Sequence, residues 1–233
     1  MPLILPGNVA TATASTTYEV ANSCMFNDDD SAYMHKTFAS GGTETAWTIS
    51  MWVKRGALGS DQRVFSCDDS SDGDPDNYWR FKSDDTLQVN IYNGSTIGNL
   101  VTNRVFRDVS AWYHICVIWK SGDSTSTDRL QLWVNGTRET SFSATTFPSQ
   151  DAATITSSQV VAIGRRNYGP QQYFDGYLAE VVFLDGVTAS PVGTLGEFDE
   201  DSPRIFKPKD PSGLTFGTNG FYLDFEDSSN LGN

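Results

Sequence analysis

The sequence predicts an all-β protein, a two-sheet antiparallel sandwich of the jelly-roll type. Three observations predict it. Apolar and polar residues alternate in most apolar runs, clusters of Gly, Asp, Ser and Asn separate these short runs, and helical patterning is nearly absent. About a dozen strands in one chain of 233 residues favour a single large sandwich over two unrelated domains.

The central strands have the clearest patterns. In residues 47–54, the apolar side chains from Trp47 to Val53 occupy alternate positions and share one face. Residues 86–92 alternate in the same way. Residues 112–120 are apolar on both faces, which indicates a central strand covered on both sides.

A hairpin is predicted over residues 129–142. The Asn135–Gly136 pair stands between two alternating runs, and a type I′ turn needs positive φ at both central positions. Further strands are expected at 33–38, 63–67, 77–82, 96–101, 159–164, 173–184 and 221–225. One short helical turn is expected within 190–200, capped by Ser190 or Thr194.

We expect three parts along the chain: an extended segment over 1–20, the sandwich over 21–189, and a second extended segment over 190–233. Pro203, Pro208 and Pro211 predict that this last segment crosses the outside of the sandwich. Its strand GFYLDF is expected to return to the first sheet and pair with N-terminal residues. The polar ending SSNLGN suggests a piece cut from a longer protein.

Composition excludes several functions. Sixteen basic and 29 acidic residues give a net charge of −13, which repels nucleic-acid backbones and anionic membrane surfaces. No apolar run approaches the roughly 20 residues that a transmembrane helix needs. Aromatic residues make up 12 % of the chain, so it is not a disordered acidic tail.

The thiols and imidazoles are sparse. Cys24, Cys67 and Cys116 are odd in number and lack CxxC spacing, which predicts free thiols in a reducing cytosol. The opening MPLILPGNVA has no basic region and does not read as a signal peptide. His35 and His114 stand far apart, which disfavours a histidine metal site or a Ser-His-Asp triad.

Several motifs in order resemble the laminin-G-like, concanavalin A-like lectin/glucanase superfamily. The resemblance covers roughly residues 20–187 and implies the jelly-roll fold. The motifs are FNDDDSAYM (26–34), WTISMWVKRG (47–56), RVFS (63–66), WYHICVIWK (112–120), LQLWVNGT (130–137), VAIGRR (161–166) and FDGYLAEVVFLDG (174–186).

The two ends are similar to structural proteins of tailed, especially marine, bacteriophages. The resemblance rests on MPLILPGNVA and on GTNGFYLDFEDSSNLGN. It implies a virion protein assembled in the bacterial cytoplasm, a tail-fibre or other surface module. Its expected partners are a host surface glycan and other virion proteins, and a homotrimer is expected by analogy with phage fibres.

Sugar sites combine aromatic platforms with planar polar groups that bond hydroxyls. The run GRRNYGPQQY (164–173) is the strongest such candidate, although its arginines could instead pair with the acidic surface. The candidate ligand-binding residues are Tyr78, Trp79, Tyr92, Asn93, Arg165, Arg166, Asn167, Tyr168 and Tyr173. The tryptophans of the strand runs (Trp47, Trp52, Trp112, Trp119 and Trp133) are interpreted as core or sheet surface instead.

A calcium ion is the only candidate cofactor. Asp68, Ser70, Asp72 and Asp74 resemble the start of a calcium loop, but Trp79 stands where the closing Glu belongs, so a solvated turn is the alternative. The resemblance also implies an early calcium motif, here Asn27 to Asp30. Its later acid would fall at Ala179, which has no ligand atom, and strand alternation would point Glu180 to the opposite face.

Catalysis is not expected. The nearest match to the family's paired acids is 197–201, beside a Pro-rich stretch, and it reads as a surface turn. Asp224 and Glu226 have no third acid in the sequence. We therefore expect a non-enzymatic, glycan-binding virion module, with a purely structural scaffold and a glycan-degrading enzyme as the alternatives.

Overall fold

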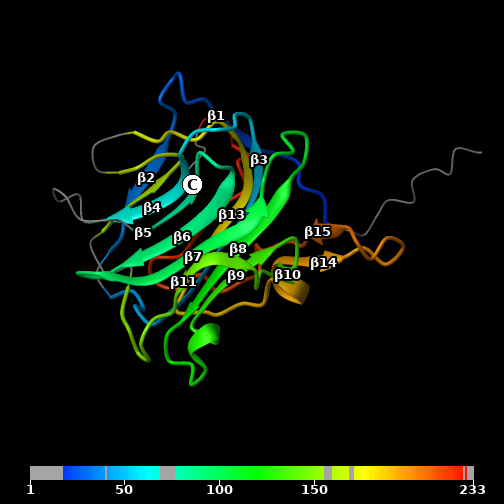
Figure 1. The fold of residues 1–233 in the computed structure, drawn as a ribbon. Helices are drawn as coiled ribbons and strands as arrows, with labels where there is room; N and C mark the ends of the chain where they lie inside the picture. The colour runs from blue at the N-terminus through cyan, green and yellow to red at the C-terminus, as the bar shows by residue number, and fades with distance from the viewer. Residues whose placement is uncertain are drawn as a thin grey trace, which may run out of the picture.

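Two antiparallel seven-stranded sheets pack face to face in the computed structural model (Figure 1). The structure describes residues 18–39, 41–68, 77–154, 159–167, 171–227 and 229. Sheet A has the order β1-β13-β3-β8-β9-β10, with β16 also paired to β13, and sheet B has the order β11-β7-β6-β5-β4-β12-β2. A third, two-stranded sheet joins β14 and β15.

The elements have the following bounds. Sheet A contains β1 (Cys24–Phe26), β3 (Ala46–Arg55), β8 (Tyr113–Lys120), β9 (Leu130–Val134), β10 (Thr137–Arg138), β13 (Gly176–Asp185) and β16 (Phe221–Leu223). Sheet B contains β2 (Met34–Thr37), β4 (Gln62–Asp68), β5 (Asn77–Phe81), β6 (Thr86–Tyr92), β7 (Thr96–Val105), β11 (Phe142–Thr146) and β12 (Val160–Ile163). The remaining elements are β14 (Gly196–Phe198), β15 (Phe206–Pro208) and the short helical turns η1 (Ser126–Asp128) and η2 (Pro191–Leu195).

The inward faces of the two sheets form the main core. Trp47 and Trp119 are fully buried and stack with ring centroids 6.1 Å apart and planes 9° apart. Trp79 belongs to the same core from sheet B, and its ring centroid lies 5.4 Å from that of Phe65. Trp47 comes from the alternating run 47–54, and the two facing sheets with a shared core confirm the predicted sandwich.

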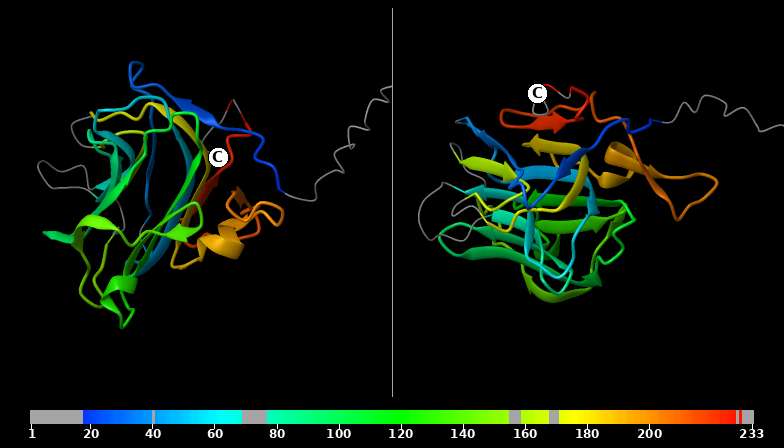
Figure 2. Two further views of the ribbon diagram at one scale, coloured as in Figure 1. Left: turned by 45° about the vertical axis from the view of Figure 1, so that its right-hand side comes forward. Right: turned by 90° about the horizontal axis from the view of Figure 1, so that it is seen from above.

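Sheet A has a second apolar layer on its outer face. Cys116 and Ile118 of β8 point away from the main core and pack with Val182 and Leu184 of β13. The segment that follows β13 covers them, because Leu195 and Phe216 belong to the same cluster. Figure 2 shows this segment, coloured orange to red, along the outside of sheet A. The predicted two-sided burial is therefore confirmed for residues 114–119, whereas Trp112, just before β8, is exposed.

Most predicted strands are present, and the differences have local causes. Asn135 and Gly136 adopt φ of 48° and 70°, as the predicted type I′ turn requires. The second hairpin arm is shorter than expected, because the chain leaves β10 after Arg138 and joins sheet B as β11. The returning strand β16 pairs with β13 rather than with N-terminal residues. The sequence reading missed β1, β14, β15 and all but the first residue of β11.

A bulge in β13 changes which residues face outward. The pairing with β3 shifts register between Ala179 and Val182, and Glu180 adopts a left-handed φ of 50°. Leu178 and Val181 face the main core. The extra residue places both Ala179 and Glu180 on the outer face, which corrects the expectation that they point to opposite faces.

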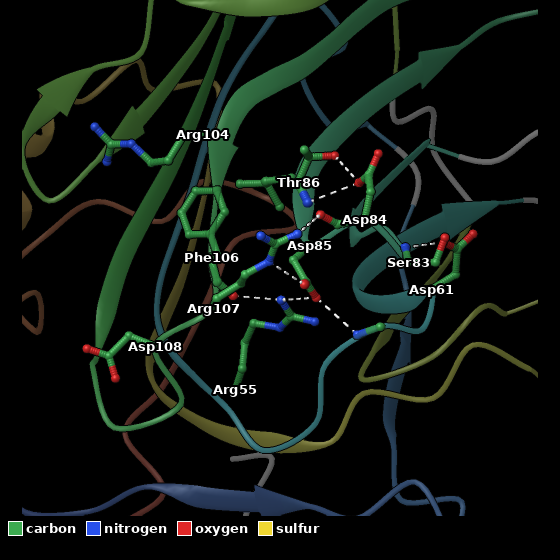
Figure 3. A network of polar contacts seen from close by, with 12 residues as sticks. Arg55, Asp61, Ser83, Asp84, Asp85, Thr86, Arg104, Phe106, Arg107 and Asp108 are labelled. Carbon is green, nitrogen blue, oxygen red and sulfur yellow. Dashed lines mark hydrogen bonds and ion pairs between the residues drawn. The ribbon is translucent and has the colours of Figure 1, made fainter.

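A buried ion pair ties loops of both sheets together at one end of the sandwich (Figure 3). Arg55 is 1 % exposed, and its Nη1 lies 3.1 Å from Asp85 Oδ1 and donates to the Phe106 carbonyl oxygen at 2.7 Å. Arg107 and the Gly59 N–H also donate to Asp85. Burial raises the pKa of Asp85, but these three donors outweigh it and hold the pKa below its ordinary value.

Candidate functional site

The sequence-predicted ligand residues of β5 and β6 lie on the outer face of sheet B, with one exception. Tyr78 and Tyr92 point outward, whereas Trp79 is 1 % exposed in the main core. The expectation that Trp79 contacts a ligand is therefore wrong, because no face of its indole reaches solvent.

Tyr78 is covered by two arginines rather than open as a platform. The guanidinium carbons of Arg63 and Arg80 lie 4.1 Å and 5.2 Å from the centre of its ring, and Tyr78 is 9 % exposed. Gln172 accepts from Arg63 Nε at 2.7 Å, and Asp61 accepts from Arg80 at 2.6 Å. This stack is a closed polar cluster that holds Gln172 against β4.

The other described candidate residues of the 164–173 run are at least half-buried or contact the chain. Arg165 lies 3.4 Å above the ring of Tyr33, and its carbonyl oxygen accepts from Ser66. Arg166, Asn167 and Tyr173 are half-buried. Asn93, in the turn after β6, donates to the Ala153 carbonyl oxygen, away from the loop. Tyr168 lies outside the described residues.

The predicted calcium loop falls on residues that the structure does not describe. Ser70, Asp72 and Asp74, with the side chain of Asp68, lie outside the described residues. Within the described residues, no three His, Cys, Asp or Glu side chains gather in a way that could hold a metal ion. Burial raises the pKa of Asp175, and the nearby carboxylates Asp28 and Asp29 raise it further.

An aromatic groove opens on the outer face of sheet A. Its volume is about 320 Å³, and its lining includes Trp52, Trp112, Phe206, Pro208, Asn22 and Ala179. Trp112 is 36 % exposed, and Trp52 is half-buried. The small side chain of Ala179, next to Trp52 in the sheet, leaves space at the floor.

Local packing explains how the groove forms. Trp52 faces outward because β3 alternates, and Phe206 of the covering segment stacks on it with centroids 6.2 Å apart and planes 20° apart. His114 lies beneath both rings, 5.2 Å from Trp52 and 5.1 Å from Phe206. His114 is 1 % exposed, and burial lowers its pKa to about 3, so its imidazole is neutral.

A second pocket of about 270 Å³ continues the groove beneath the N-terminal residues. The two share Ala21 and Asn22 in their linings. Five carboxylates line the pocket, and they come from the N-terminal residues, β13 and the C-terminal segment: Glu19, Glu180, Asp210, Asp224 and Glu226.

Glu180 is the buried member of this pocket, at 5 % exposure. Its Oε2 accepts from the hydroxyls of Tyr18 at 2.8 Å and Tyr222 at 2.7 Å. Burial raises the pKa of Glu180; the two tyrosine hydrogen bonds lower it, and Asp224 and Asp210 raise it again. Burial also raises the pKa of Tyr18 to about 12. The tyrosine hydrogen bonds therefore anchor the N-terminal wall of the groove.

Sequence reasoning missed this site for two reasons. It assigned Trp52 and Trp112 to core or sheet surface, and it placed Glu180 on the wrong face. The one available signal was Trp52 itself, a large aromatic among the polar positions of residues 47–54. The rest depends on the β13 bulge and on the path of the C-terminal segment.

The comparisons with known proteins define the family. The sequence profile of the concanavalin A-like lectin/glucanases superfamily matches residues 27–190, well over half of the chain. The chain therefore belongs to this superfamily, which confirms the resemblance seen in its motifs. No curated protein matches the sequence.

The chain is similar to several solved structures at low sequence identity. The native heptameric SAP-like pentraxin from Limulus polyphemus is 18 % identical, over 77 % of this chain and 91 % of its own, with a TM-score of 0.50. Domains LG4-5 of the mouse laminin alpha1 chain are 13 % identical, over 69 % and 40 %, with a TM-score of 0.47. The Ruminococcus gnavus IT-sialidase CBM40 bound to alpha2,3 sialyllactose is 16 % identical, over 62 % and 88 %, with a TM-score of 0.43.

The described part of the chain contains no helix that is long and apolar enough to span a bilayer.

Proposed function

We propose that this protein is a non-enzymatic carbohydrate-binding module of a tailed-phage virion, and that it binds glycan in the aromatic groove on sheet A. The observation that carries the proposal is the groove itself, a concave site with Trp52 and Trp112 in its wall. Indole faces stack on the apolar face of a pyranose ring, and Asn22 supplies a planar polar group for hydroxyls.

Membership of a superfamily that includes lectins supports carbohydrate binding in general. The groove also favours binding over a purely structural scaffold, for which we would expect no aromatic-lined cleft. The phage assignment rests on the resemblance of the two chain ends, and it includes the virion location, virion protein partners and a homotrimer.

The test of glycan binding compares the two faces directly. We expect Trp112→Ala to reduce retention on a glycan array or on host cells by about tenfold or more, because an exposed stacking platform is lost. Arg165→Ala, on the 164–173 loop, is the matched variant on sheet B and should leave retention within about twofold. Loss of retention in the loop variant alone would move the site to sheet B.

Calcium is tested in the same assay. Retention with and without a chelator shows whether an ion in the 68–74 loop supports binding. Unchanged retention would remove calcium from the proposal and leave the groove in place.

Glycan degradation is the second candidate, because one observation favours it. Glu180 shares a pocket next to the groove with four other carboxylates, and its pKa is raised, chiefly by burial. The test is whether the protein releases reducing sugar from glycan and whether Glu180→Gln abolishes this release. If the variant loses the release but keeps its fold and its glycan retention, an enzymatic function replaces the binding proposal.

The virion assignment has its own test. Antibodies against the purified protein should label particles of the phage that encodes it, in electron micrographs, and should reduce adsorption to its host. Particles without label would contradict the virion role and leave glycan binding unaffected.

A further inference from the structure

The second pocket, lined by Glu19, Glu180, Asp210, Asp224 and Glu226, is called the acidic pocket below. None of the described residues that line it is Lys, Arg or His. Lys207 lines the neighbouring groove, and its ammonium lies 3.5 Å from Glu197, its partner on β14, and 3.6 Å from Asp199. Lys209 also pairs with Glu197, at 3.5 Å. Both lysines are therefore paired with acids that do not line the pocket.

The pocket stays charged at neutral pH even though Glu180 is buried. Hydrogen bonds from Ser212 lower the pKa of Asp210, so this carboxylate is ionised over the whole physiological range. Asp210 and Asp224 line the same pocket as Glu180, and their charges raise its pKa. Their negative field extends into the groove, since the groove and the pocket meet at Ala21 and Asn22.

We propose that Asp210 and Asp224 are specificity-determining residues that make the groove discriminate among saccharides by charge: it accepts uncharged sugars and rejects sugars that carry a carboxylate or a sulfate. The inference rests on the proposed glycan binding in the groove. An anionic sugar bound in the groove meets the negative field of the adjoining pocket, and like-charge repulsion in a partly enclosed site lowers its affinity.

The experiment uses the full chain on an array that pairs neutral oligosaccharides with the same oligosaccharides extended by sialic acid, uronic acid or sulfate. We expect the wild type to bind neutral members and to bind their acidic counterparts at least about fivefold more weakly at low salt. Raising the salt to 0.5 M should narrow this gap, because the repulsion is screened.

The variant Asp210→Asn/Asp224→Asn removes two charges next to the groove. We expect it to strengthen binding of the acidic sugars by about threefold per charge. The matched control, Glu200→Gln/Asp201→Asn, removes two exposed charges in the loop between β14 and β15 and should change neither class. Circular dichroism and thermal unfolding check that both variants remain folded.

The outcomes separate the inference from the function on which it rests. Acidic sugars that bind the wild type as well as neutral ones would overturn the charge discrimination and leave glycan binding intact. An equal gain in the control variant would assign the discrimination to net charge rather than to Asp210 and Asp224. Absence of binding to any sugar would overturn the proposed function, and the inference with it.

Discussion

The two outer faces of the sandwich use their aromatic residues in opposite ways. On sheet B, Tyr78 lies under Arg63 and Arg80, so the face is closed by its own side chains. On sheet A, the chain covers most of the face with the C-terminal segment but leaves Trp112 36 % exposed at the edge of the cover. An exposed aromatic next to a built wall is a better indicator of a ligand site than an aromatic-rich loop.

We expect the largest loss of stability from breaking the buried ion pair that joins the two sheets. Asp85→Ala leaves the Arg55 guanidinium buried without its carboxylate, which costs about 3–5 kcal/mol of unfolding free energy. Urea unfolding measures it. The exposed neighbour Asp84→Ala should cost about 1 kcal/mol or less. Equal losses in both variants would show that the ion pair does not hold this end together.

Removing the cover of sheet A is the next largest effect. Phe206 is 7 % exposed and packs on Trp52, His114 and Phe198. We expect Phe206→Ala to cost about 3 kcal/mol and to reduce glycan retention, since the groove loses a wall. The matched variant Ile205→Ala, at 57 % exposure, should change neither quantity measurably. A stable Phe206→Ala protein would mean that the covering segment contributes little to folding.

The buried imidazole of sheet A makes stability depend on pH. Burial lowers the pKa of His114 from about 6.5 in the unfolded state to about 3 in the folded state, so between these two pH values only the unfolded chain binds this proton. Stability is therefore retained above pH 6.5 and falls as the pH approaches 3, by about 1 kcal/mol per pH unit. Unfolding experiments at pH 7, 6 and 5 measure this slope.

The variant His114→Gln serves as the control, because its side chain does not titrate. We expect its stability to fall less steeply than that of the wild type between pH 7 and 5. Parallel curves would assign the acid sensitivity to groups other than His114.

The smallest effect is expected on the closed face. Tyr78→Leu removes the ring beneath Arg63 and Arg80 and should cost about 1 kcal/mol, in the range of partly buried cation–π contacts. Glycan retention should not change. A loss of retention with unchanged stability would return the binding site to sheet B.

The sequence determined the sandwich because its information is local. Alternation over residues 47–54 and 86–92 specifies which side chains enter the core, and Asn135–Gly136 specifies its turn by backbone sterics. Apolar residues on both faces of 112–120 also predicted a central strand. None of these inferences required knowledge of a distant segment.

Only the tertiary structure decided where the candidate site lies. Strand alternation places Glu180 in the core, and a one-residue bulge turns it outward beside Tyr18 and Tyr222. Phe206 reaches Trp52 from more than 150 positions further along the chain, by a path that runs across a Pro-rich segment. A groove formed by such non-local contacts has no periodic signature, because its walls are brought together by packing rather than by spacing in the sequence.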